Sequence, residues 1–95
     1  MIRVVAHVTA KPDKIEHTRN ALLQLIAPTR AEDGCVKYEL LQNEADPTDF
    51  AFVEEWASQE ALDKHFRTAH FNAANSAAAD LLSSPPDIRT YRVIA

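Results

Sequence analysis

The sequence holds one glycine, Gly34, and one cysteine, Cys35, among its 95 residues. A single glycine excludes the glycine-rich loops through which proteins cradle phosphates, nucleotides and flavins. A single cysteine excludes an internal disulfide, and Cys35 has no neighbours in a metal-ligand spacing. Free cysteines are most often simply buried, so an ordinary buried thiol is favoured over a reactive one.

Basic residues and long apolar runs are also scarce. Ten Lys and Arg stand against 14 Asp and Glu, a net charge of −4, which argues against a nucleic-acid partner because phosphate binding requires a basic surface. No apolar run approaches the roughly 20 residues of a membrane-spanning helix. The first residues follow a strand pattern rather than that of a signal peptide. We therefore expect a cytoplasmic protein with no membrane partner.

The remaining composition is ordinary for a soluble protein, 46% hydrophobic and 25% charged. The chain is long enough for one domain, which we expect to span residues 1–95. A domain of this size buries about 60–65% of the surface of its unfolded chain, so its own core is modest. Association with a second chain is one way to bury more.

Hydrophobic periodicity predicts four strands and two helical regions. The strands are expected at residues 2–10, 35–42, 50–56 and 87–95, and the helices at 12–32, 58–69 and 71–82. Pro28 falls inside the first helix and is expected to kink it or end its regular part. Gly34 is expected to form the left-handed cap that stops this helix.

The order β-α-β-β-α-β is that of the ferredoxin-like α+β class, with a four-stranded antiparallel sheet and helices on one face. The first and third strands carry apolar residues on both sides, which a sheet covered on one face does not need. A second copy packed sheet to sheet would cover the other face. We therefore expect a homodimer.

A carboxylate, an indole and an imidazole converge on one apolar space in the predicted fold. Side chains alternate along a strand, so Phe52, Glu54 and Trp56 share one face. In the helix that follows, His65 lies on the same apolar face as Leu62. If this helix packs over this strand, the three polar groups border a space suited to an aromatic guest.

Three segments of the sequence carry a family resemblance. Residues 30–38 read R-x-E-x-G-C-x-x-Y, residues 54–56 read E-x-W, and residues 60–71 read E-A-L-x-x-H-x-x-x-x-H-F. In this order and spacing they resemble the antibiotic biosynthesis monooxygenase family of small dimeric α/β-barrel proteins, which includes quinol monooxygenases. The resemblance covers essentially the whole chain and implies the fold more firmly than a reaction, because one fold serves many functions.

Haem and metal ions are not expected as cofactors. The haem-degrading relatives of this family carry an Asn on the first strand and an axial His late in the second helical region. Here His7 and Asn75 hold those places. The four histidines show neither H-x-x-x-H nor H-x-H spacing, so no metal site is expected either.

The expected function is that of a cofactor-independent monooxygenase acting with O₂ on a quinol or a polycyclic phenol. A neutral histidine in an apolar pocket can accept the phenolic proton, and His65 is the expected base. Glu54 is expected to hold that imidazole or a substrate hydroxyl. The residues expected to contact the substrate are Trp56, His70, Phe71, His7 and Phe52.

Two alternatives remain open at this point. The first is an isomerase that moves a proton beside the carbonyl of a small compound with the same histidine; Arg3, Arg89 or Arg92 would matter if that compound were phosphorylated. The second is a non-catalytic binding or stress module whose pocket holds a hydrophobic small molecule. The polar residues would then form a half-buried cluster with no catalytic role.

Overall fold

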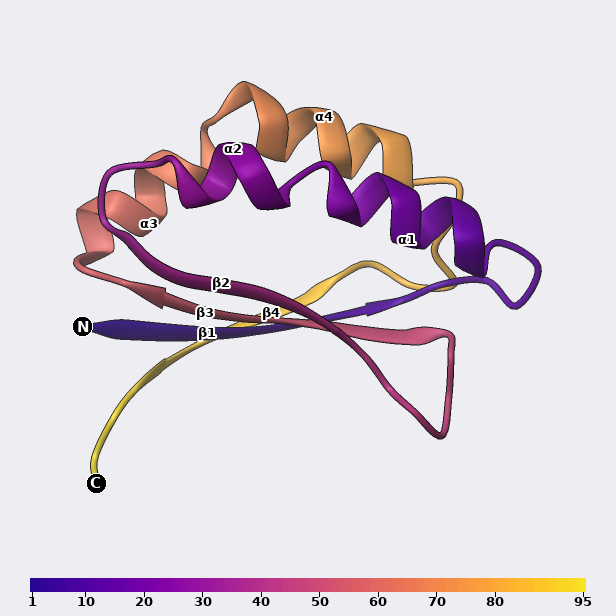
Figure 1. Cartoon of the computed structure of the whole chain (residues 1–95), viewed down its shortest axis with the longest axis horizontal. Coiled ribbons are helices and arrows are strands. Elements are labelled where there is room, and N and C mark those ends of the chain that lie inside the picture. Colours follow the sequence, from indigo (N-terminus) through magenta and orange to yellow (C-terminus); the bar gives the residue numbers. More distant parts are fainter.

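A computed structural model describes all 95 residues, and its elements confirm the ferredoxin-like α+β fold. The sheet has the strand order β2-β3-β1-β4, and every pairing is antiparallel. All helices cover one face of it (Figure 1). The elements are β1 (Ile2–Thr9), α1 (Ile15–Leu23), α2 (Ile26–Arg30), β2 (Cys35–Gln42), β3 (Asp49–Trp56), α3 (Gln59–Phe66), α4 (Ala69–Ala78) and β4 (Asp87–Arg92).

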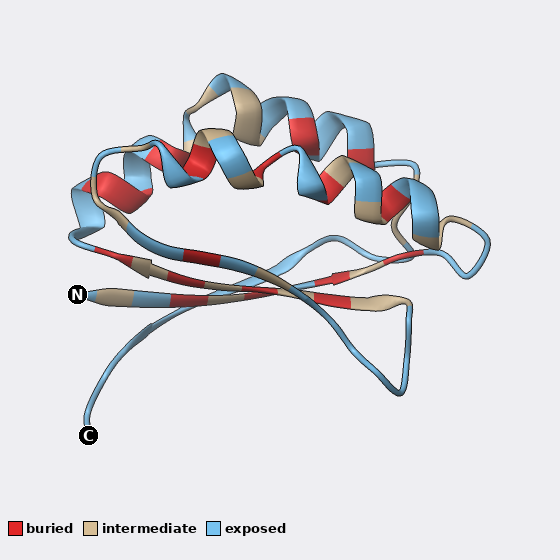
Figure 2. Ribbon diagram, in the orientation of Figure 1, coloured by how far each residue is buried: buried red, intermediate tan, exposed pale blue.

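The core lies between the sheet and the helices, and strand alternation builds its floor (Figure 2). Every second residue of β3, from Phe50 to Trp56, is buried. In β1, Val4, Ala6 and Val8 point to the same side and are no more than 5% exposed. Because β3 and β1 are the two central strands, their inner faces fix where a site can form.

The first helical region is two helices rather than one. α1 ends at Leu23 and α2 begins at Ile26, with Pro28 inside the short second helix. A proline ring conflicts with the carbonyl group four residues earlier, which here belongs to Gln24. The break therefore falls four residues before the proline, and the region begins at Ile15 rather than at residue 12.

The second helical region divides where a threonine caps a new helix. Ser58 accepts a hydrogen bond from the Ala61 N–H at 3.1 Å and begins α3. Thr68 accepts one from the Phe71 N–H at 3.2 Å and begins α4. Each hydroxyl satisfies a donor that the first helical turn leaves free. α3 consequently ends at Phe66, earlier than the sequence pattern predicts.

Gly34 has a positive φ of +84°, as expected, but it does not cap the helix. α2 has already ended at Arg30, and Gly34 lies in the turn into β2 that the Cys35 N–H closes on the Glu32 carbonyl at 3.2 Å. A Cβ atom at Gly34 would lie 2.5 Å from the Ala61 Cβ. The glycine therefore permits both the backbone conformation and the close approach of α3.

The outer face of the sheet has no helical cover. It presents alternating apolar and charged residues, including Val5 opposite Val53 and an ion pair between Arg3 and Glu55 at 2.5 Å. The chain after β4 leaves the sheet on this side (Figure 1), and Ile94 is 91% exposed. None of the helices has the length and hydrophobicity that a membrane crossing requires.

Replacing Gly34 by valine should lower the free energy of unfolding by about 2–4 kcal/mol. About 1–2 kcal/mol comes from the left-handed backbone and the rest from the clash with Ala61. Urea denaturation measures the difference, and Ala77→Val, an exposed change in α4, is the control for adding the same side chain. Equal unfolding midpoints for both variants would contradict this role of Gly34.

Candidate functional site

Strand β3 presents three of the expected site residues to the helices. Phe52, Glu54 and Trp56 are 4%, 4% and 0% exposed, as their alternation predicts. Phe52 and Glu54 line a cavity between the sheet and α4, whereas Trp56 lies beside that cavity. One strand thus supplies both an apolar wall and the buried carboxyl group.

The cavity is small and mostly apolar. Its volume is about 40 Å³, enough for a few water molecules but well below the roughly 150 Å³ of a cavity that holds benzene. Its polar lining residues are Tyr38, Glu54 and Asn75, and its aromatic walls are Phe52, Phe66 and Phe71. The lining thus offers polar and aromatic groups to a ligand, but an aromatic ligand fits only if the cavity widens.

A surface groove continues the cavity toward solvent. The groove runs along the C-terminal half of α4 and the segment from Ser83 to Pro86. Both spaces share the lining residues Asn75, Ala78, Leu82, Pro86 and Ile88. The groove that joins the cavity therefore lies at the C-terminal end of α4, whereas His70 lies in the first turn of that helix.

Burial changes the acidity of Glu54. Desolvation raises the pKa of its carboxyl group from the usual 4.5 to about 7. A hydrogen bond from the Trp56 indole N–H, at 2.8 Å, opposes this rise, and the nearby charge of Glu32 adds to it. Glu54 thus changes between a neutral and a charged form near neutral pH, in contact with the cavity.

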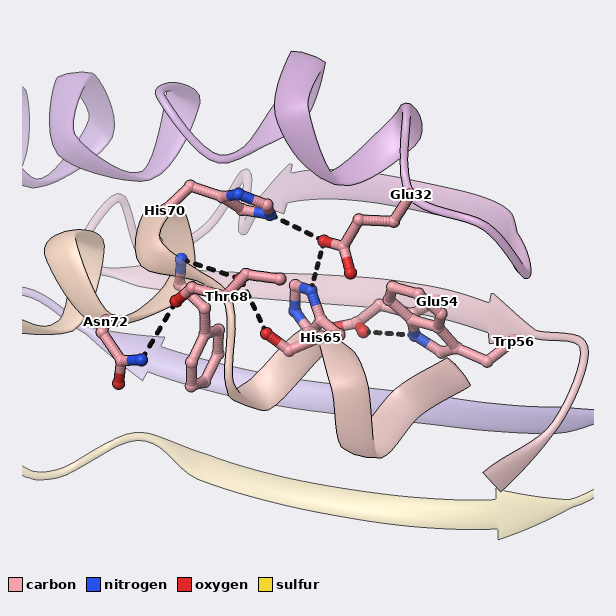
Figure 3. A network of polar contacts seen from close by, with 8 residues as sticks. Glu32, Glu54, Trp56, His65, Thr68, His70 and Asn72 are labelled. Atoms are coloured by element: carbon pink, nitrogen blue, oxygen red, sulfur yellow. Dashed lines mark hydrogen bonds and ion pairs between the residues drawn. The ribbon is translucent and has the colours of Figure 1, made fainter. Parts of the chain in front are cut away.

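Glu32 holds two imidazoles on one oxygen atom (Figure 3). Its Oε2 lies 2.8 Å from Nδ1 of His65 and 2.7 Å from Nε2 of His70. Glu54 was expected to hold the His65 imidazole or a substrate hydroxyl, but the carboxylate in contact with His65 is that of Glu32. An ionised carboxylate only accepts, so both of these ring nitrogens carry hydrogens, and Nε2 of a neutral His65 keeps its lone pair.

His65 is enclosed by aromatic rings. Its side chain is 1% exposed, and the ring centroids of Trp56 and Phe71 lie 4.7 and 5.0 Å from its own. Burial lowers the pKa of His65, and the hydrogen bond to Glu32 opposes that change. The ring is not part of the cavity lining, although it packs against Phe66 and Phe71, which are.

His7 does not join the site. Its position in β1 faces the outer side of the sheet, where it pairs with Asp49 at 3.4 Å and its side chain is 51% exposed. A substrate contact between His7 and the cavity therefore does not fit the fold. Asn75, named only for its place in the haem comparison, lines the cavity instead.

Sequence reasoning missed Glu32 and Tyr38 as site residues. Both lie in the R-x-E-x-G-C-x-x-Y segment, which carried the family resemblance but had no chemical role. The signal for Tyr38 was available, because β2 pairs with β3 and places Tyr38 opposite Glu54. No comparable signal pointed to Glu32, which lies in a turn.

Replacing Glu54 by glutamine should stabilise the protein more at pH 8 than at pH 4. Since the folded pKa of about 7 exceeds the unfolded value of 4.5, the native state holds a proton that the unfolded state loses between these values. Wild-type stability therefore falls over that range by about 3 kcal/mol, and glutamine removes the fall. Urea denaturation at both pH values measures it, with the exposed Glu44→Gln as control. A pH-independent difference between Glu54→Gln and the wild type would contradict it.

Comparison with known proteins agrees with this architecture. The profile of the family described as "Antibiotic biosynthesis monooxygenase" matches residues 1–77. A Synechocystis protein named "Uncharacterized protein sll1783" is 35% identical over 97% of the chain, which spans 63% of that protein's length. The Bacillus subtilis protein named "Putative monooxygenase YcnE" is 32% identical over 93% of each chain.

Solved structures extend the likeness to three dimensions. A conserved protein from Methanosarcina mazei is 34% identical, with a TM-score of 0.90 over 96% of this chain and 90% of its own. A protein from Nitrosomonas europaea superposes over the whole of both chains with a TM-score of 0.95 at 24% identity, which shows the shared fold. The matched profile and these relatives place the chain in the antibiotic biosynthesis monooxygenase family.

Proposed function

We propose that the protein is a cofactor-independent monooxygenase that oxidises a quinol or a polycyclic phenol with O₂, and that Glu54 is its proton acceptor. The observation that carries the proposal is the carboxyl group of Glu54, which lines the cavity and has a pKa of about 7. A base works best when its pKa lies near the working pH. The membership of the family supports the reaction class.

The reaction asks little of the protein besides a base and a dry space. Glu54 removes the phenolic proton, and the electron-rich anion passes one electron to O₂. The two radicals join through a new C–O bond at a ring carbon that carries a hydrogen, and Glu54 returns its proton to the peroxide. Cleavage of the O–O bond with loss of the ring hydrogen as a proton then releases water and leaves a quinone. Both electrons that reduce the second oxygen atom come from the substrate, so no external reductant is needed. The buried cavity excludes bulk water from this sequence.

Aromatic walls suit the flat guest of such a reaction. Phe52, Phe66 and Phe71 line the cavity, and aromatic rings favour stacked and edge-on contacts with one another. The hydroxyl of Tyr38 and the amide of Asn75 are available to a phenolic oxygen. A bicyclic guest fits only when the cavity and its groove open into one space, since the cavity alone is too small.

The position of His65 supports a different role from the one expected. It lies behind Phe66 and Phe71 and outside the cavity lining, so direct contact with a phenol requires those rings to move. We assign it the positioning of the aromatic wall, anchored through Glu32. The geometry also disfavours an isomerase of a phosphorylated compound, because the lining contains neither Lys nor Arg.

We also propose a homodimer formed through the uncovered outer face of the sheet. Val5 and Val53 form a half-buried apolar pair in the two central strands. The chain after β4 leaves the sheet on the same side (Figure 1) and contains the exposed Val93 and Ile94. An uncovered sheet face with a central pair of half-buried valines, next to exposed apolar residues, favours a second copy of the same surface. Such a partner would add buried apolar surface to the modest amount that this small domain buries on its own.

Glu54→Gln should lower the turnover of a hydroxylated naphthalene by about 10²–10⁴-fold, the range for a positioned base. The wild-type rate should rise with pH through about 7 and then level off, because the carboxylate form is the active one. An oxygen electrode and quinone absorbance measure turnover. Binding of the product quinone should change little, since apolar walls supply most of that affinity.

Two variants make the activity test specific. His17→Ala removes an exposed imidazole and should leave turnover unchanged. His65→Asn retains an N–H for Glu32 and should affect turnover less than Glu54→Gln. Full oxygen uptake by Glu54→Gln together with its loss in His65→Asn would assign the base to His65 and contradict the assignment made here.

Val53→Glu should convert the proposed dimer to a folded monomer, because it places a charge at the centre of the buried face. Sedimentation at micromolar concentration measures the mass, and circular dichroism checks the fold. Leu23→Glu, on the exposed side of α1, is the matched control and should remain dimeric. A wild-type protein that sediments as a monomer would refute the dimer.

A further inference from the structure

The cluster of Glu32, His65 and His70 has the composition of a metal site. One oxygen and two nitrogens, each free to act as a ligand atom, lie within 4.8 Å of one another. They come from three segments: the turn before β2, the helix α3 and the first turn of α4. The carboxylate forms no ion pair with Lys or Arg, and its only polar partners are the two imidazoles.

The break between α3 and α4 creates this cluster. In one continuous helix, residues five apart point about 140° away from each other, so His65 and His70 would face different sides. The cap at Thr68 starts a new helix and turns His70 back toward Glu32 (Figure 3). Thr68 also donates to the His65 carbonyl at 2.8 Å, which joins both histidines to one short rigid segment.

The cluster has a closed side and an open side. The His65 side chain is 1% exposed, whereas the side chains of Glu32 and His70 are 13% and 26% exposed. An ion can therefore reach the nitrogens and the oxygen from solvent and keep water on its outer positions. Three protein ligands with an open position are the pattern of sites that bind a metal and a further molecule.

The donor set selects the class of ion. Two imidazoles and one carboxylate suit Zn²⁺ and divalent iron or cobalt, whereas Ca²⁺ and Mg²⁺ prefer oxygen ligands. The present N–O distances of 2.7 and 2.8 Å are hydrogen-bond lengths. Ligands about 2.0–2.1 Å from one ion are about 3.3 Å apart in a tetrahedral site. Because Glu32 lies in a turn, a small shift of its side chain can lengthen both N–O distances to this value.

We infer that Glu32, His65 and His70 bind one divalent transition-metal ion per chain, of the Zn²⁺ or Fe²⁺ class. The ion replaces the two N–H···O hydrogen bonds. Each coordinating imidazole then carries its hydrogen on its other ring nitrogen. This site is separate from the oxidation proposed at Glu54, and the aromatic rings of Phe66 and Phe71 lie between His65 and the cavity.

Calorimetric titration of the chelator-treated protein with Zn²⁺ tests the inference without any measurement of activity. The expected result is one Zn²⁺ ion per chain. When Co²⁺ is used instead, we expect visible d–d absorption bands that report its coordination by the protein. Glu32→Gln and His70→Ala should each weaken Zn²⁺ binding by at least about 100-fold, since even outer partners of metal ligands are worth 10–100-fold. Both variants leave the buried His65 in place, and circular dichroism checks that they fold.

His17→Ala is the matched control, because it removes an exposed imidazole that lies outside the cluster. It should bind Zn²⁺ as the wild type does. Equal binding by the wild type and by the Glu32→Gln, His70→Ala double variant would overturn the inference. So would a wild-type protein that takes up neither Zn²⁺ nor Co²⁺ at a tenfold excess.

Discussion

One carboxylate oxygen, Oε2 of Glu32, joins the parts of the chain that form the site. It connects the turn before β2 to α3 through His65 and to α4 through His70. The turn itself depends on Gly34, whose missing side chain lets α3 approach. Loss of the carboxylate would leave two imidazoles without a partner in a largely apolar region, which is costly for buried polar groups. The position of the aromatic wall therefore depends on a residue outside every regular element.

Glu54 illustrates how a site works against the stability of its own fold. The carboxyl group occupies a position on β3 that an apolar residue could fill, between Phe52 and Trp56. One hydrogen bond from the Trp56 indole satisfies part of it, and burial raises its pKa to about 7. Buried groups with strongly shifted pKa values gather at functional sites because the function needs the shift. The raised pKa of Glu54 therefore supports the role proposed for it above.

The sequence predicted the features that depend on neighbours along one strand or helix. Alternation placed Phe52, Glu54 and Trp56 under the helices, and helical spacing placed His65 over them. The features that it missed depend on a break between two helices and on contacts between residues far apart in the sequence. The break at Thr68 brings His70 to Glu32, although a spacing of five excludes such a pair in a regular helix. Asn75 lines the cavity from α4, and His7, expected to contact the substrate, lies on the outer face of the sheet together with Val5.

The narrowness of the cavity has a kinetic consequence. If the cavity takes the aromatic guest proposed above, that guest binds only to a wider form of the cavity, so the fraction of molecules in this open form enters every measured affinity. With an open population of about 1%, the apparent Kd is about 100 times the intrinsic one. At high ligand concentration the observed binding rate then reaches a maximum equal to the rate at which the cavity opens. Substitutions among the five residues that line both spaces would then change the speed of uptake and leave the carboxyl group of Glu54 in place; these residues are Asn75, Ala78, Leu82, Pro86 and Ile88.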